Sequence, residues 1–177
     1  MPSSRNKSHL TVQEIAVFGM LGALIYASKW LMELLPNIHL IGVFIVAMTV
    51  VYRAKALYPL YIFVLLAGIF SGFATWWLAY LYIWTVLWGF TMLLPKRIPL
   101  ALQPLVYAAV CSLHGFLFGV LYLPIQMLFF HLKWEQIPLW LAAGIGFDIT
   151  HGISNFICGL LICPIILVLR QAKKLSN

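Results

Sequence analysis

Residues 39–72 read HLIGVFIVAMTVVYRAKALYPLYIFVLLAGIFSG, which is two apolar runs separated by a short basic gap at Arg53 and Lys55. Basic residues also stand before the first apolar run of the chain, between the fourth and fifth runs, and after the last. These residues are Arg5, Lys7, Lys96, Arg97, Arg170, Lys173 and Lys174. Nine of the eleven Lys and Arg residues therefore occupy every second gap, which is the positive-inside pattern of a multi-pass membrane protein. Both termini are predicted to be cytoplasmic, and the number of crossings is predicted to be even.

The composition excludes a soluble domain. Apolar residues make up 64% of the chain and charged residues only 8%, and the mean hydropathy is +1.01. So few polar groups could not cover the surface of a soluble protein. The net charge of +7 is spread over the predicted cytoplasmic gaps, where it faces an anionic leaflet rather than a nucleic acid.

We therefore predict an all-α integral membrane protein of the cell membrane, a bundle of six transmembrane helices in one domain, residues 1–177. Residues 1–11 are expected to form a cytoplasmic lead-in rather than a cleaved signal peptide, and residues 171–177 a cytoplasmic tail. The helices are expected over about 12–35, 39–52, 57–70, 75–94, 100–123 and 139–170. The last is too long for one untilted crossing of about 20 residues, so its outer part is expected to bend or to lie along the surface. Pro164 is expected to add a kink near the inner end of this helix.

A ladder of small residues marks the first predicted helix. Gly19, Ala23 and Ala27 follow one another at intervals of four, so they share one helix face and would let another helix approach closely. Packing within the bundle and docking of a partner helix are both open interpretations.

An aromatic run dominates the fourth predicted helix. Trp77, Trp84 and Trp88 fall on one face, with Tyr80 between them. A belt at the membrane interface would explain one or two of these rings. A wall that stacks against a planar ligand would use them all, and the sequence leaves both interpretations open.

Polar side chains interrupt the sixth predicted helix. Asp148, His151 and Asn155 stand at i, i+3 and i+7 and so share a face. Ionisable groups within a membrane span are costly and mark either a paired structural contact or a functional site. We favour a ligand pocket open to the outside, with a pair between Asp148 and His151 or Lys29 as the structural alternative.

The outer end of the first predicted helix is expected to lie at the opening of the same pocket. Lys29 and Glu33 are one turn apart, which is the spacing of a surface ion pair, but Lys29 is also deep enough to face Asp148 across the bundle. Asn37 and His39 follow in the loop that would cap the opening.

Enzymatic signatures are absent from the sequence. It contains no nucleophile elbow, no HExxH motif and no phosphate-binding loop, and its four carboxylates are widely spaced. We predict that the chain is not an enzyme and that it cannot drive transport with ATP of its own. The paired carboxylates or inverted repeat of many ion-coupled carriers are not visible either.

The length, the six predicted helices and the Ala23-x-x-x-Ala27 motif resemble the S components of energy-coupling factor (ECF) vitamin transporters, over essentially the whole chain. The resemblance implies high-affinity capture of a vitamin and no cofactor or metal site of the chain's own. It also implies that the face of Gly19, Ala23 and Ala27 docks onto a transmembrane scaffold subunit, which works with two cytoplasmic ATPase subunits.

The substrate is indicated by three stretches, 36–40, 73–84 and 146–155, which look like a branch associated with cobalamin uptake. A corrinoid and a modified nucleobase such as a queuosine precursor both suit a mouth with few charges. The residues expected to bind the substrate are Lys29, Asn37, His39, Trp77, Tyr80, Trp84, Asp148, His151 and Asn155. His39, His114, His131 and His151 are candidate ligands for cobalt, and the sequence does not choose among them. A stand-alone carrier or channel and a purely structural membrane protein are the competing classes.

Overall fold

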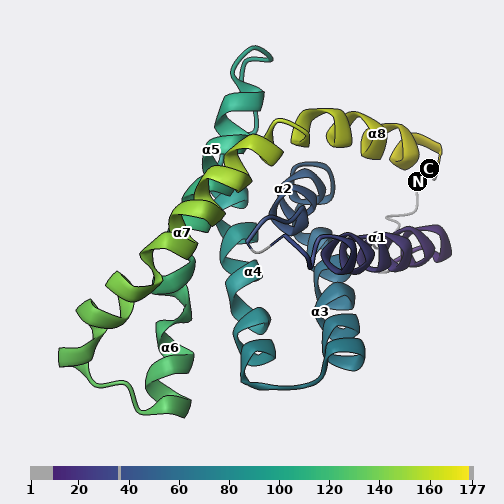
Figure 1. Ribbon diagram of the computed structural model, residues 1–177. Coiled ribbons are helices and arrows are strands. Elements are labelled where there is room, and N and C mark those ends of the chain that lie inside the picture. The colour runs from purple at the N-terminus through teal and green to yellow at the C-terminus, as the bar shows by residue number, and fades with distance from the viewer. Residues whose placement is uncertain (1–9, 36, 176–177) are drawn as a thin grey trace, which may run out of the picture.

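The computed structural model describes residues 10–35 and 37–175 (Figure 1). Arg5, Lys7 and Pro36, on which parts of the sequence interpretation depend, lie outside these residues. The described chain contains helices, turns and loops but no strand, which confirms the all-α prediction for this part. The helices are α1 Val12–Leu31, α2 Ile41–Tyr52, η1 Arg53–Ala56, α3 Leu57–Ser71, α4 Thr75–Leu93, α5 Gln103–Phe116, α6 Phe118–Phe130, η2 Trp134–Gln136, α7 Ile137–Gly159 and α8 Ile162–Leu175, where η denotes 3₁₀ helices.

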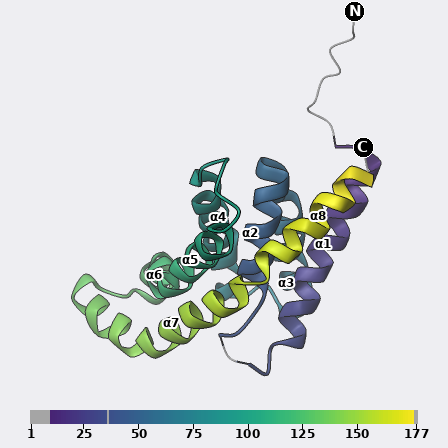
Figure 2. The same cartoon turned by 90° about the horizontal axis from the view of Figure 1, so that it is seen from above.

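The helices run in two main directions. In Figure 1, α3, α4, α5 and α6 extend along the vertical of the page, while α8 lies across the top and α2 is seen nearly end-on. Figure 2, the view from above, shows α1, α2 and α8 lengthwise instead. Helix α2 therefore crosses the α3–α4 hairpin at a steep angle rather than continuing α3.

Helix α2 forms the centre of the fold. Every residue of it except Val50 is buried, and a helix that is apolar on all sides belongs in an interior. It packs mainly against α4 and α8. Ile162, Ile166 and Leu169 of α8 are buried at intervals that place them on one helix face.

Among the described residues, four segments are long and apolar enough to cross a membrane: Val12–Leu31, Ile41–Ser71, Thr75–Leu93 and Gln103–Phe130. The pair Trp134–Gly159 and Ile162–Lys174, bent by 52°, makes a fifth if it is one broken span. These apolar helices are compatible with a membrane protein, but length and composition give four or five crossings where the sequence predicted six. The predicted and observed numbers of crossings differ because α2 and α3 were predicted as two crossings but fall within the single segment Ile41–Ser71. They have 12 and 15 residues, fewer than the roughly 20 that one crossing needs. Because α2 is enclosed by protein, its length need not match the lipid.

The largest differences from the predicted boundaries lie in the fifth and sixth predicted helices. The fifth predicted helix was expected to end at residue 123, yet after a break at Leu117 the chain continues as α6 to Phe130, with Pro124 inside it. The sixth predicted helix bends between α7 and α8, close to the kink expected at Pro164, and not in its outer part. Pro138 lies in the first turn of α7, where its missing N–H leaves no helical hydrogen bond unmade.

Candidate functional site

A cavity of about 480 Å³ opens at the end of the molecule where α1 ends and α2 and α4 begin. Its size falls within the range of about 300–1,000 Å³ for small-molecule sites. Its lining consists of Lys29, Met32, Glu33, Leu35, Asn37, Ile38, His39, Ile41, Ser71, Trp76, Tyr80, Phe118, Tyr122 and His151. Of the nine predicted substrate-binding residues, it brings together Lys29, Asn37, His39, Tyr80 and His151.

One wall of the cavity is an aromatic ladder on α4. Trp76, Tyr80 and Trp84 are one helical turn apart, with ring centroids separated by 5.1 Å and then 5.4 Å. Trp76 and Tyr80 line the cavity, whereas Trp84 is fully buried below it. The Trp84 ring contacts that of His39, which does line the cavity, at 5.7 Å.

Trp77 does not belong to this wall. Its Nε1 donates a hydrogen bond of 2.8 Å to the carbonyl oxygen of Val64, and its ring packs against Phe73. It therefore joins α4 to α3. The cavity-facing side of α4 therefore keeps Tyr80, as predicted, but has Trp76 in the place expected for Trp77.

Two histidines form the floor of the cavity. The rings of His39 and His151 meet edge to face at 4.6 Å, and Phe118 lies 4.8 Å from His151. Nδ1 of His39 and Nε2 of His151 are buried and have no hydrogen-bond partner among the described residues. A buried polar atom left unsatisfied costs about 1–3 kcal/mol, so such atoms in a cavity indicate a ligand or bound water. Burial, with a further effect of nearby His114, lowers the pKa of His39 to about 4, so this imidazole is neutral at pH 7.

The mouth of the cavity carries one charge of each sign. The Lys29 ammonium lies 3.9 Å from a carboxylate oxygen of Glu33 and 6.0 Å from the centre of the Trp76 ring. Lys29 therefore does not pair with Asp148. Asn37 is tied to α7 because the Ser154 hydroxyl donates to its carbonyl oxygen at 2.8 Å. Its φ of 60° is left-handed, a conformation that Asn adopts more readily than most residues.

Asp148 and Asn155 hold helices together instead of lining the cavity. Asp148 Oδ1 accepts a hydrogen bond of 3.0 Å from the backbone N–H of Gly119, one of the groups left unpaired at the start of α6. Asn155 is fully buried, and its Nδ2 donates to the carbonyl oxygen of Cys111 on α5 at 3.2 Å. Of the three polar residues that share this face of α7, only His151 reaches the cavity.

Several lining residues were missed from the sequence. Trp76 could have been found by stepping one helical turn back from Tyr80. Phe118 and Tyr122 are also one turn apart, but they lie in a uniformly apolar run where no polar neighbour marks a site. Ser71 stands at the end of α3 and gave no signal of its own.

The small-residue ladder on α1 lies on the surface. Ala23 and Ala27 are exposed, and a Cβ atom at Gly19 would meet no described atom within 4 Å. The close contact of α1 with α3 uses Gly22, where a Cβ atom would lie 2.5 Å from Cγ2 of Ile62. Within the described chain the ladder is therefore not an internal packing face, which leaves docking as the interpretation to test.

The other histidines are less suited to a ligand. His114 is fully buried, and its Nε2 lies 3.0 Å from the carbonyl oxygen of Ile83. His131 ends α6 in a left-handed conformation. The described residues contain no group of three or more His, Cys, Asp or Glu side chains that could hold a metal ion.

Comparisons with protein-family models, with curated proteins and with solved structures found no match in any of the three.

Proposed function

We propose that this protein is the substrate-capture subunit of an ECF-type vitamin importer. The observation that carries the proposal is the pair of unpartnered imidazole nitrogens on His39 and His151, buried at the floor of a cavity with an aromatic wall. Buried polar atoms that nothing in the described chain satisfies are what a pocket built for a polar ligand would contain.

The lining favours a planar and largely uncharged ligand. Trp76 and Tyr80 offer ring area for contact, and Lys29 and Glu33 cancel each other's charge at the mouth. A queuosine precursor is small enough for the cavity as it stands. A corrinoid, which we place first, exceeds it, so its capture would require the segment between α1 and α2 to move outward.

A corrinoid would give the two histidines a specific role. Neutral imidazole is the commonest metal ligand among side chains, and His39 and His151 both carry an unpartnered nitrogen and line the cavity. His114 also has an unpartnered nitrogen, Nδ1, but it lies below the cavity against Trp84, with ring centroids 5.4 Å apart, which makes it the weaker candidate.

Transport in this proposal uses the surface ladder of Gly19, Ala23 and Ala27. That face would dock onto the transmembrane scaffold subunit, and the two cytoplasmic ATPase subunits would supply the energy. The whole chain would then tip in the membrane, with both termini on the cytoplasmic side, and present the loaded cavity inward. Its apolar exterior suits this motion, because tilting exposes few polar groups to lipid.

A stand-alone secondary carrier is the competing proposal. It would need a path from the cavity to the other side of the chain. Trp84 and Leu87 of α4, which stand directly below the cavity, are both fully buried, so the protein interior there is filled by side chains. This packing supports a capture subunit that moves as one body.

The proposal is tested by isothermal titration calorimetry of the detergent-purified chain against cobalamin, cobinamide, queuine, riboflavin, folate and pantothenate. We expect tight binding of one of them, cobalamin and cobinamide first, and its weakening by about tenfold or more in His151→Asn, as expected for the loss of a hydrogen bond or ligand bond in a buried site. His131→Asn, which alters an exposed histidine outside the cavity, is the matched control. A chain that binds none of these compounds, or that binds equally well after His151→Asn, would refute the proposed site.

A further inference from the structure

A second cavity, of about 420 Å³, lies at the opposite end of α2 and α4. Its lining includes Thr91 and Leu94, whereas the first cavity uses Trp76 and Tyr80 of the same helix. Tyr80 and Thr91 are about 16 Å apart along the α4 axis, at 1.5 Å per residue. The two cavities are therefore separate sites.

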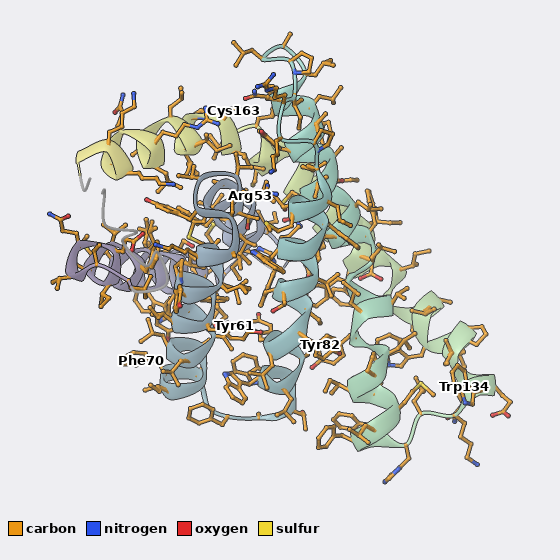
Figure 3. All side chains as sticks on the ribbon, turned by 180° about the vertical axis from the view of Figure 1, so that it is seen from behind. Arg53, Tyr61, Phe70, Tyr82, Trp134 and Cys163 are labelled. Atoms are coloured by element: carbon orange, nitrogen blue, oxygen red, sulfur yellow. The ribbon has the colours of Figure 1, made fainter. Side chains whose placement is uncertain are left out.

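Four cationic side chains surround the second cavity: Arg53, Lys96, Arg97 and Arg170. They come from three gaps of the sequence, after α2, between α4 and α5, and from α8. Figure 3 shows Arg53 at the same end of the molecule as α8 and the turn between α4 and α5, while Trp134 lies at the other end. The fold thus gathers residues that the positive-inside pattern alone would leave scattered.

The four carboxylate side chains of the sequence lie elsewhere in the fold. Glu14 pairs with Lys55 at 2.6 Å, Glu33 pairs with Lys29, and Asp148 accepts from Gly119. Glu135, the last of the four, lies in η2 between α6 and α7. None of them lines the second cavity, so its four cations meet no acidic group of the described chain there. Gathered like charges repel one another unless an anion lies between them.

Arg53 has an unusual backbone conformation and is held in place by two hydrogen bonds. Its φ of 54° and ψ of −125° fall in a region that costs a non-glycine residue about 1–3 kcal/mol. Trp88 Nε1 donates to its carbonyl oxygen at 3.2 Å, and its own Nη2 donates to the carbonyl oxygen of Met92 at 3.1 Å. These bonds fix the guanidinium beside the cavity.

We infer that this cavity binds a phosphate group, and that the group belongs to the headgroup of an anionic phospholipid. Guanidinium groups match phosphate oxygens with paired hydrogen bonds, and three of the four cations are arginines. Apolar side chains complete the lining, among them Val50, Leu94 and Ile98. Leu93 and Leu100, 84% and 81% exposed, flank the basic turn where acyl chains would lie. Basic pockets between transmembrane helices on the cytoplasmic side are suited to such headgroups.

The first arm of the test measures the thermal unfolding midpoint of the whole chain in a neutral detergent. Phosphatidylglycerol, phosphatidylcholine of the same chain length and inorganic phosphate are added separately. We expect phosphatidylglycerol to raise the midpoint and the other two to leave it nearly unchanged. An equal rise with phosphatidylcholine would overturn the phosphate site, and an equal rise with inorganic phosphate would overturn the assignment to a lipid.

The second arm uses variants of exposed side chains, which leave the core untouched. Lys96→Gln with Arg97→Gln and Arg170→Gln should abolish the rise, whereas Lys133→Gln, which removes a cation from the α6–α7 loop, should retain it. Arg97→Lys with Arg170→Lys keeps the charge and the positive-inside pattern but removes the forked donors. We expect it to weaken phosphatidylglycerol binding by about tenfold, as the loss of a charge-assisted hydrogen bond would.

Native mass spectrometry of the same preparations counts the bound lipid directly, so a variant that unfolds early is still informative. Full retention of phosphatidylglycerol by the lysine variant would show diffuse surface charge and refute the site. Full retention of phosphatidylglycerol by the glutamine variant would also refute the site. Displacement of the lipid by an acidic peptide at equal concentration would reassign the cavity to a protein partner. None of these outcomes depends on which vitamin the first cavity captures.

Discussion

The α1 ladder offers the sharpest separation of folding from transport, because neighbouring residues of the same helix have different surroundings. Ala23 is exposed, whereas Gly22 is buried against α3. We expect Ala23→Trp and Ala27→Trp to abolish uptake of the ligand by cells while ligand binding to the isolated chain stays within about twofold. Gly22→Val should instead destabilise the fold.

The magnitudes follow from the space around each residue. A Cβ atom at Gly22 would lie 2.5 Å and 2.7 Å from two carbon atoms of Ile62 and 3.0 Å from the carbonyl oxygen of Pro59. The carbonyl is backbone and cannot swing aside, so the substitution overpacks the α1–α3 contact, which costs about 1–3 kcal/mol. Ala23 and Ala27 are exposed, so larger side chains there should change the free energy of unfolding by no more than about 0.5 kcal/mol.

The measurement pairs cellular uptake with calorimetric binding and thermal unfolding of each purified variant. Ala109→Trp, at an exposed alanine of α5, adds the same bulk to a face that carries no ladder, so it should transport normally. If Ala23→Trp and Ala27→Trp lost binding and stability together with uptake, the ladder would be packing. Normal uptake by both would show that this face does not dock.

Three further predictions concern the cavity and its surroundings. Asp148→Ala should cost about 1 kcal/mol of unfolding free energy, as for a lost helix cap, and leave the ligand affinity unchanged. Asp148→Asn keeps the acceptor for Gly119 N–H and should unfold like the wild type. A loss of ligand affinity in either variant would place Asp148 in the site. Tyr80→Ala should weaken ligand binding by about tenfold through lost ring contact, whereas Trp77→Ala should lower the thermal unfolding midpoint and leave the ligand affinity intact. A loss of ligand affinity in Trp77→Ala would instead support Trp77 as part of the wall, as the sequence predicted. The pKa of His39 is about 4 in the fold against an ordinary value of 6.5, so the unfolded chain takes up this proton first as the pH falls. The stability that depends on neutral His39 should be complete above pH 6.5 and decrease between pH 6.5 and 4, by up to about 3 kcal/mol. His39→Asn should flatten the profile of unfolding midpoint against pH. An unchanged slope in that variant would show that His39 is not the group that titrates.

The helices were largely predictable because apolar runs and basic gaps are local properties of the sequence. The predicted segments 39–52, 57–70 and 75–94 agree with α2, α3 and α4 to within three residues. The extension of α6 past Pro124 was not predictable, because other contacts, such as the hydrogen bond from Gly119 N–H to Asp148 on a distant helix, stabilise α6.

The candidate site was predictable only in part, since spacing reports which residues share a helix face but not what that face meets. His151 and Asp148 stand on one face of α7, yet one reaches the cavity and the other caps α6. For a similar reason, Trp77 was predicted for the α4 wall where Trp76 lines the cavity. Trp77 and Trp76 are equally aromatic, and the neighbouring helix α3 decides which ring is used to hold the helices together.

The burial of α2 has a consequence for biosynthesis. It is the second helix to leave the ribosome, but α8, the last one, supplies much of its cover. Lys173 of α8 even donates to the carbonyl oxygen of Val51 at 3.1 Å. A nascent chain therefore holds its most apolar helix without its final neighbours until translation has ended. Premature stop codons in α8 should leave a product that membrane quality-control proteases recognise. The first cavity would keep all its lining residues, and the second would lose only Arg170.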